Sequence, residues 1–146
     1  MPRQNTTLES EGAEFLVLGH LLIQGIPSYK TYTNMAGYDI TATNPDRNRS
    51  ARIQVKSRWR TGAEGFIIKN FDCDFVVVVY LNRGSKDGTA KIQDPEFFIL
   101  PTQKVKDSHD PSNKWGKLSS SRIPGFKLHL NDWQAIKDFL HGAAQA

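Results

Sequence analysis

The chain has 146 residues, 38% of them hydrophobic and 23% charged, which excludes a disordered chain and suits one domain with a sizeable core. Its formal net charge of +4 is compatible with a polyanionic partner, and its single cysteine excludes an intrachain disulfide or a cysteine zinc cluster. Residues 1–12 lack the apolar stretch of a signal peptide and no apolar run approaches the ~20 residues of a membrane span, so we expect a cytoplasmic protein with no membrane partner.

The first predicted element is a helix from Leu8 to Gln24. Thr6 and Glu9 have the spacing of a capping box, and Gly25 follows the last apolar residue. The apolar residues between these ends are too dense for an ordinary surface helix, so the pattern predicts a helix that is largely buried. They are Phe15, Leu16, Leu18, Leu21, Leu22 and Ile23.

Alternating apolar and polar residues predict a β-hairpin in the next part of the chain. Residues 26–37 are expected to form a short strand and a loop. Residues 38–43 (YDITAT) and 51–59 (ARIQVKSRW) are predicted to be antiparallel strands, because the turn-forming sequence NPDRNRS lies between them. Residues 66–70 (FIIKN) are expected to form a short strand or a pairing edge.

The rest of the chain supplies two further strands and a final helix. The β-branched run at 74–82 (DFVVVVYLN) predicts a strand buried on both faces, and residues 96–101 predict another. Residues 102–125 are polar and irregular, which favours a mobile loop, whereas residues 131–141 predict a helix with one apolar face. This order predicts an α/β fold in a single domain, with a central mixed β-sheet flanked by helices.

Three polar side chains of the predicted hairpin form a candidate site. Gln54 and Lys56 are two residues apart on one strand, so they project to the same side of the sheet, and Asp39 lies on the neighbouring strand. A carboxylate and an amide oxygen suit Mg²⁺, which prefers oxygen ligands. A metal held there activates water, and a nearby lysine offsets charge on a phosphate. These groups together indicate phosphodiester hydrolysis.

The sequences GYDI and IQVKSR resemble the PD-(D/E)xK nuclease superfamily, in the variant where Gln replaces the middle acid. The layout is similar to that of archaeal Holliday-junction resolvases and of the homing endonucleases of this fold, and the resemblance covers roughly residues 8–100. It implies a restriction-endonuclease-like core. It also implies catalytic and metal-binding roles for Asp39 and Gln54, and a catalytic role for Lys56.

In the resolvase-like branch, a glutamate of the first helix lies about three turns before a closing glycine. Glu14 precedes Gly25 by 11 residues and matches that position best, with Glu11 as the fallback. The resemblance therefore implies that Glu14 is both a catalytic residue and an auxiliary metal ligand. An amide at position 54 supplies no charge, so metal affinity should be lower, and Glu14 would restore the lost negative charge.

The activity that the resemblance implies is that of a Mg²⁺-dependent endonuclease, with Mn²⁺ as a substitute, which hydrolyses DNA by attack of a metal-activated water. No organic cofactor is expected. Because one site cuts one strand, the chain is expected to act as a homodimer or a higher homo-oligomer.

Residues 51–70 contain five Lys or Arg and one acid, and this local charge indicates where DNA would bind. Trp59 either stacks on a base or belongs to the core, and Ser57 either touches the scissile phosphate or only pairs on its strand. The candidate DNA contacts are Ser57, Arg58, Trp59, Arg60 and Lys69. A second basic series either aids solubility or forms a second DNA-contacting surface. Its members are Lys104, Lys106, Lys114, Lys117, Arg122 and Lys127.

Each site residue also has an ordinary structural interpretation. Lys56 taken alone fits a surface lysine, Asp39 a turn acid at the start of a strand, and Glu14 an acid favoured by the helix dipole. At the level of the whole chain, two other functions stay open. One is a weakly active or inactive DNA-binding module with a nuclease fold, and the other is a protein-interaction accessory of a mobile element or defence system.

Overall fold

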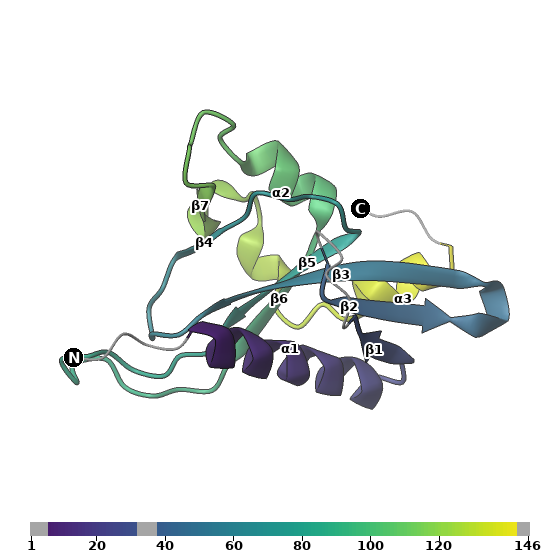
Figure 1. The fold of residues 1–146 in the computed structure, drawn as a ribbon, viewed down its shortest axis with the longest axis horizontal. Coiled ribbons are helices and arrows are strands. Elements are labelled where there is room, and N and C mark those ends of the chain that lie inside the picture. The colour runs from purple at the N-terminus through teal and green to yellow at the C-terminus, as the bar shows by residue number, and fades with distance from the viewer. Residues whose placement is uncertain (1–5, 32–37, 143–146) are drawn as a thin grey trace.

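The computed structural model describes residues 6–31 and 38–142, and these residues form an α/β fold around a mixed five-stranded sheet (Figure 1). The strand order is β1-β2-β3-β5-β6, and β3–β5 is the parallel pair among these strands, whereas the other neighbours are antiparallel. This confirms the expected fold class. The strands are β1 (Ser28–Lys30), β2 (Ile40–Asn44), β3 (Arg49–Arg58), β5 (Phe75–Tyr80) and β6 (Glu96–Pro101).

One face of the sheet is covered by α1 (Thr6–Ile23) and α3 (Gln134–Leu140). Ala13, Val17 and Leu21 recur every four residues, so they lie on one side of α1 and pack, fully buried, on the sheet. His20 of α1 stacks on Trp133, which immediately precedes α3, at a centroid distance of 5.4 Å. The two helices therefore share one apolar core.

The other face is covered by short elements from a stretch predicted to be a mobile loop. Residues 102–125 instead contain α2 (Thr102–Ser108), β7 (Lys117–Ser119) and the 3-10 turn η2 (Ser120–Arg122), and η3 (Phe126–His129) follows. The loop prediction was wrong because each of these elements is too short to show a period. Tertiary burial holds them in place, through Val105, Leu118 and Ile123.

Strand β7 pairs with β4 (Gly65–Ile67) in a small second sheet beside α2 (Figure 1). Gly65 lies so close to its partner strand that a Cβ atom there would be 2.7 Å from the Leu118 carbonyl oxygen. Glycine is therefore required for this pairing. Strand β5 lies between the two cores and is buried along its whole length, as its β-branched sequence predicted.

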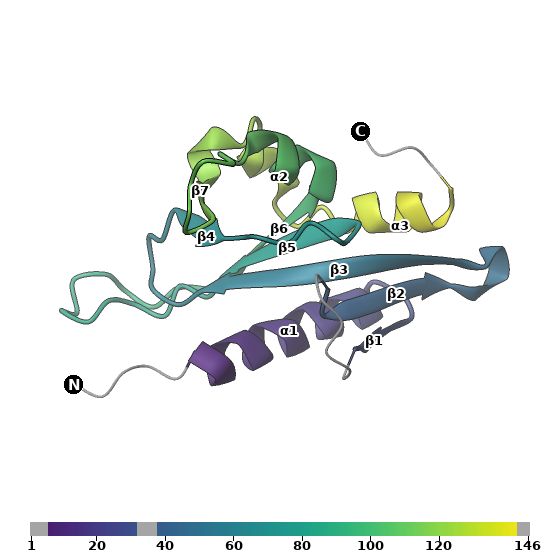
Figure 2. The same ribbon diagram turned by 45° about the horizontal axis from the view of Figure 1, so that its top comes forward.

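The predicted hairpin of β2 and β3 is confirmed, with a register from Ile40 opposite Ile53 to Asn44 opposite Arg49. Its turn is the 3-10 segment η1 (Pro45–Arg47), after which Asn48 takes a left-handed conformation at φ 51°. Asparagine tolerates this conformation better than most residues. The hairpin extends past the rest of the sheet (Figure 2). Residues 32–37, which belong to the segment predicted as a strand and loop, lie outside the described residues.

The prediction of a largely buried first helix was wrong. Helix α1 lies along the lower side of the molecule in Figure 1, with only one side against the sheet. Several of its large apolar residues are exposed, among them Phe15, Leu22 and Ile23. The final helix begins at Gln134, three residues later than predicted. In the part of the chain that the structure describes, no helix is long and apolar enough to cross a membrane.

Candidate active site

Strand β3 sets the direction of Gln54 and Lys56. Gln54 pairs with Val76 of β5 and Lys56 pairs with Val78, and both valines belong to the core on the α2 side of the sheet. Paired residues share a face of a sheet, so Gln54 and Lys56 point to that side. Val55, between them, points to the α1 side and packs partly buried against that core. The alternation of the strand thus separates a polar pair from the apolar residues around it.

Asp39 is fixed to β3 by its main chain and by its side chain. Its N–H donates to the Ile53 carbonyl at 2.8 Å, and its Oδ2 accepts a 2.8 Å hydrogen bond from the N–H of Val55. The carboxylate therefore satisfies a main-chain donor of β3, beside Gln54 and Lys56. Among the described residues, the hydrogen bond from Val55 engages Oδ2, which leaves Oδ1 as the oxygen that could bind a cation.

Gln54 carries an acceptor that nothing in the described chain satisfies. The residue is 7% exposed, and its Oε1 is buried without a hydrogen-bond partner among the described residues. A buried acceptor left unsatisfied costs about 1–3 kcal/mol. This oxygen is a ready ligand for a cation, and it is the observation on which the fit of a metal to this site rests.

Glu14 lies on α1, which covers the face of the sheet opposite to the one that Gln54 and Lys56 point to, and it pairs with a lysine that sequence reasoning missed. The Lys30 ammonium lies 3.5 Å from Glu14 Oε1 and also forms an ion pair with Glu11, the fallback residue. The side chain of Lys30 is 3% exposed, so this charge is enclosed by its partners. No local pattern pointed to Lys30, because both acids lie more than a dozen residues earlier in the chain.

The charges of these residues act on one another. Burial raises the pKa of Asp39, whereas the Val55 N–H and the ammonium groups of Lys56 and Lys30 oppose the rise. Burial also raises the pKa of Glu14, and the Asp39 carboxylate adds to the rise. Burial lowers the pKa of Lys56, and Asp39 opposes that change. Asp39 is thus electrically coupled to Glu14 on one side and to Lys56 on the other.

The donor set suits a hard cation. Asp39 and Glu14 offer carboxylate oxygens and Gln54 offers an amide oxygen, which are ligand types that Mg²⁺ accepts while it keeps several waters. Within the described ranges, no three His, Cys, Asp or Glu side chains are grouped so that they could hold a metal. A site here would therefore depend on the amide of Gln54 as well as on the two acids.

A groove opens where β3 ends, and four of the five candidate DNA contacts line it. Its volume is about 790 Å³, and its walls also include the start of α1 and the turn after β5. Trp59 is 44% exposed there, so it does not belong to the core. Ser57 donates to Glu9 Oε1 at 3.3 Å, and Arg58 donates to the Gly65 carbonyl at 2.5 Å. The candidates that line the groove are Ser57, Arg58, Trp59 and Arg60.

Lys69 lies elsewhere, because it borders a smaller pocket of about 200 Å³ formed by residues that follow β4 and by His109 to Lys117. The groove also contains Arg83 and Lys86, which sequence reasoning did not select. Both stand in the polar turn RGSKDGTAK, and their charges were the available signal.

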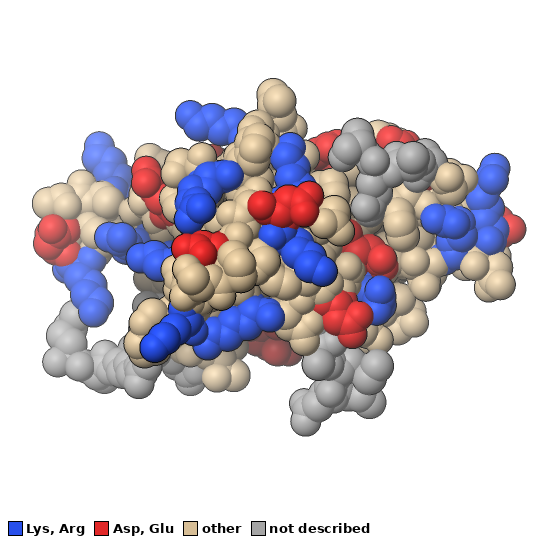
Figure 3. All heavy atoms as spheres, turned by 90° about the horizontal axis from the view of Figure 1, so that it is seen from above, with Lys and Arg blue, Asp and Glu red and all other residues tan. Residues whose placement is uncertain are grey.

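The second basic series comes from the part of the chain that contains α2 and β7. Figure 3 shows the face above α2, where Lys and Arg side chains are spread out with Asp and Glu among them. Lys104 is in contact with His129, with its Nζ 2.8 Å from Nε2. This distribution favours the solvated interpretation of the series over a second DNA surface.

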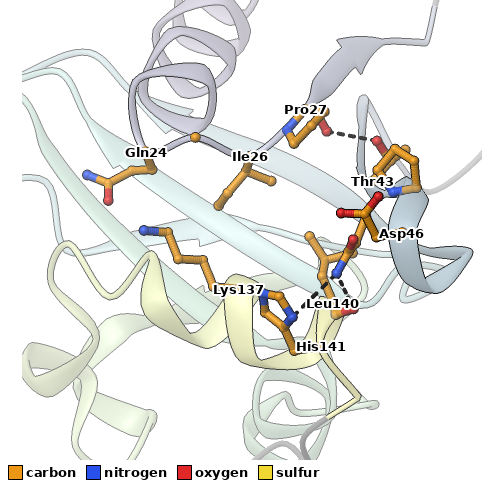
Figure 4. A pocket seen from close by; sticks show the side chains of 11 residues that line it. Gln24, Ile26, Pro27, Thr43, Asp46, Lys137, Leu140 and His141 are labelled. Atoms are coloured by element: carbon orange, nitrogen blue, oxygen red, sulfur yellow. Dashed lines mark hydrogen bonds between the residues drawn. The ribbon is translucent and has the colours of Figure 1, made fainter.

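A further pocket, of about 410 Å³, lies at the other end of α1 (Figure 4). It lies between the segment after α1, the end of β2 with its turn, and α3. Asn44 joins the last two by donating to the Leu140 carbonyl at 3.2 Å. Lys137 of α3 and His141, which follows α3, also line the pocket. None of the candidate catalytic residues is among its lining residues, so this pocket is separate from the candidate site.

No family model matches the chain, and no curated protein matches its sequence. Among solved structures, the chain is similar to the bacterial homing endonuclease I-Ssp6803I, with a TM-score of 0.62. The two sequences are 18% identical, and the match covers 94% of this chain and 96% of that one. At this identity, the likeness shows that the chain has a nuclease-like fold.

Proposed function

We propose that the chain is a Mg²⁺-dependent endonuclease that hydrolyses phosphodiester bonds in DNA. The observation that carries the proposal is the buried, unsatisfied Oε1 of Gln54 beside Asp39 and Lys56. The fold supports the class of activity, since the similar solved structure is that of a homing endonuclease. The fold by itself specifies no activity, so the argument depends on the site.

Three residues would hold the metal: Asp39, which directly precedes β2, Gln54 of β3 and, as an auxiliary ligand, Glu14 of α1. Bound there, Mg²⁺ would lower the pKa of a water molecule and offset negative charge on the phosphate. The N–H of Val55 holds the Asp39 carboxylate in position, and Lys30 offsets the charge of Glu14. Both interactions fix the orientation of a carboxylate before a metal ion binds.

Lys56 would act on the phosphate. Its ammonium group is half-buried on the same face as Gln54, and burial lowers its pKa, so the charge is poorly solvated. A cation held in such surroundings interacts strongly with the charge that develops on the phosphate oxygens during hydrolysis. Lys56 is therefore assigned to electrostatic stabilisation and positioning.

The groove at the end of β3 would bind the DNA backbone. Its Arg and Lys side chains suit phosphates, and the exposed ring of Trp59 offers a surface on which a base can stack. The groove begins one residue after Lys56, so DNA bound there would lie next to the catalytic residues. The basic members of the groove are Arg58, Arg60, Arg83 and Lys86.

Cleavage assays on duplex, branched and single-stranded DNA, with Mg²⁺, Mn²⁺ or a chelator, test the proposal. We expect metal-dependent cleavage that Asp39→Asn abolishes, because asparagine keeps the acceptor for Val55 but removes the charge. Asp46→Asn is the matched control, since Asp46 is exposed in the hairpin turn. Full activity in Asp39→Asn, or no cleavage of any of these DNAs by the parent protein, would overturn the proposal.

The alternative is a DNA-binding module with this fold that does not cleave. The neutral side chain of Gln54 favours it, because an amide binds Mg²⁺ less strongly than a carboxylate. Titration calorimetry separates the two functions. Retained DNA binding without any uptake of Mg²⁺ or Mn²⁺ is the result that would favour the alternative.

A further inference from the structure

The outward side of α1 carries five of the twelve large hydrophobic side chains that are exposed among the described residues. The opposite side of this helix packs on the sheet through alanine, valine and leucine. A helix with apolar residues on two opposite sides is normally covered on both sides. Helix α1 instead lies at the edge of the molecule, with no described helix or strand beneath it (Figures 1 and 2). The outward apolar side chains, with their exposed fractions, are Leu8 (72%), Phe15 (52%), Leu16 (40%), Leu22 (52%) and Ile23 (82%). The Lys30 ammonium lies over the Phe15 ring, 4.1 Å from its centroid, and the rest of that ring stays open to solvent.

These residues form a continuous stripe. Leu8, Phe15 and Leu22 recur every seven residues, and Gly12 and Gly19 lie between them at alternating steps of four and three. That spacing keeps residues along one line of a helix that packs against another helix. The exposed apolar area is on the order of 600 Å², at the upper limit for a typical monomer and close to the ~800 Å² that each partner contributes to a stable interface.

Neither Gly12 nor Gly19 is required for packing among the described residues. Both lie inside α1 with ordinary helical backbone, and a Cβ atom at either position would have no neighbour within 4 Å. Glycine is an unfavourable residue in a helix interior, and alanine would fit both positions without a clash. Two indentations on the outward side of α1 are the consequence, one on each side of Phe15.

We propose that α1 is the surface through which two copies of this chain associate, with their α1 helices antiparallel across a twofold axis. In an antiparallel pair, each large residue of the stripe faces a glycine of the other copy, so that Phe15 fills an indentation next to Gly12 or Gly19. A parallel pair would instead place Phe15 against Phe15 and glycine against glycine. It would also bring together the acidic first halves of the two helices, which contain Glu9, Glu11 and Glu14.

The proposal does not rest on nuclease activity, and it commits to a second copy because the stripe is complementary to itself. Light scattering and sedimentation equilibrium measure the outcome directly. We expect a particle of twice the 16.5 kDa chain mass, and Phe15→Glu should weaken association by at least about 100-fold while the far-UV circular dichroism stays unchanged. Leu128→Glu is the matched control, because Leu128 is 84% exposed outside α1 and should leave the dimer intact.

Filling the indentations gives a second test that misfolding cannot imitate. The double variant Gly12→Leu, Gly19→Leu should have a higher melting temperature as a monomer, because each leucine favours the helix and points into open space. The same variant should fail to dimerise. A gain in monomer stability together with loss of the dimer is expected only if another chain occupies the space next to these glycines.

Three results would overturn the proposal. The first is a parent chain that is a monomer at all protein concentrations. The second is a Phe15→Glu variant that remains a dimer, and the third is a leucine variant that associates more tightly than the parent. Spin labels at Gln24→Cys, in a Cys73→Ser background, test the orientation. In the antiparallel pair the labels lie at opposite ends of helices about 27 Å long, whereas a parallel pair brings them close together and contradicts the antiparallel arrangement.

Discussion

Strand β3 carries two polar regions that differ in their surroundings. In the middle of the strand, Gln54 is buried and Lys56 half-buried between the two layers that cover the sheet. At its end, Trp59 and Arg60 are exposed in the groove. The first region is rich in perturbed groups, since burial shifts the pKa of Asp39 and Lys56 away from their ordinary values. The second region combines positive charge with open space.

Under the proposed function, the middle of β3 would take part in catalysis and its end would bind DNA. Buried polar groups are poorly solvated and therefore interact strongly with one another. Such groups are typical of catalytic sites. Exposed cations are well solvated and bind a polyanion through many weak contacts. We therefore expect variants in the middle of β3 to change the rate of cleavage, and variants at its end to change the affinity for DNA.

A large effect on the cleavage rate is expected from the lysine. Lys56→Gln should lower the single-turnover cleavage rate about 10²–10³-fold, because it removes the poorly solvated charge next to the phosphate. DNA affinity measured by fluorescence anisotropy should change little. Lys69→Gln is the control, since Lys69 is exposed outside the groove and should retain the parent rate. A strong loss of affinity with an unchanged rate in Lys56→Gln would place this residue with the groove.

Gln54 links activity to stability. Gln54→Met should abolish metal-dependent cleavage and raise the free energy of unfolding by about 1–3 kcal/mol, because it removes an unsatisfied buried acceptor at similar volume. Urea unfolding, monitored by circular dichroism, measures the change. A less stable Gln54→Met protein would mean that the amide has a structural partner, and the metal assignment would then lose its support.

The groove variants should act on binding alone. Trp59→Ala should weaken DNA binding by about 1–3 kcal/mol through loss of stacking. Arg60→Ala should reduce the slope of log affinity against log salt by about 0.9, the effect of one phosphate contact. Cleavage rates at saturating protein should equal that of the parent. Lys91→Ala, at an exposed position that does not line the groove, provides the comparison.

The smallest expected effect is on stability as a function of pH. Because burial raises the pKa of Asp39 in the folded chain, its ionisation at neutral pH destabilises the fold. Asp39→Asn should therefore melt at a higher temperature than the parent at pH 7. The difference should shrink as the pH falls through the raised pKa of Asp39, and vanish below its ordinary value of 3.8. Calorimetry at a series of pH values, without metal, would contradict this prediction if the gap widened in acid.

The sequence predicted the parts of the fold that have a clear local period. Alternation identified β2 and β3, and the run of β-branched residues identified β5, because strand geometry imposes a period of two or demands burial on both faces. The same periods could not reveal α2 or β7, which are short and depend on partners far away in the chain. The hairpin also predicted that Asp39 lies beside β3, whereas its position just before β2 and its hydrogen bond from Val55 needed the structure.

Two features, one in the candidate site and one on the outward side of α1, needed the three-dimensional structure. Lys30 meets Glu11 and Glu14 only because β1 packs beside α1, and neither segment contains a signal of that contact. The density of apolar residues in α1 was read as burial, although the same residues are also what an uncovered association surface requires. Sequence composition cannot distinguish a helix covered by its own chain from one covered by another.

The length of β3 has a geometric consequence. The strand has ten residues, so its terminal arginines, Arg49 and Arg58, are held about 30 Å apart. Both side chains are tied to main-chain oxygens, Arg49 to Phe139 at 3.0 Å and Arg58 to Gly65 at 2.5 Å. This separation approaches one helical repeat of B-form DNA, about 34–36 Å. A duplex aligned with the strand would meet an arginine near each of its ends, with the proposed catalytic residues Gln54 and Lys56 between them.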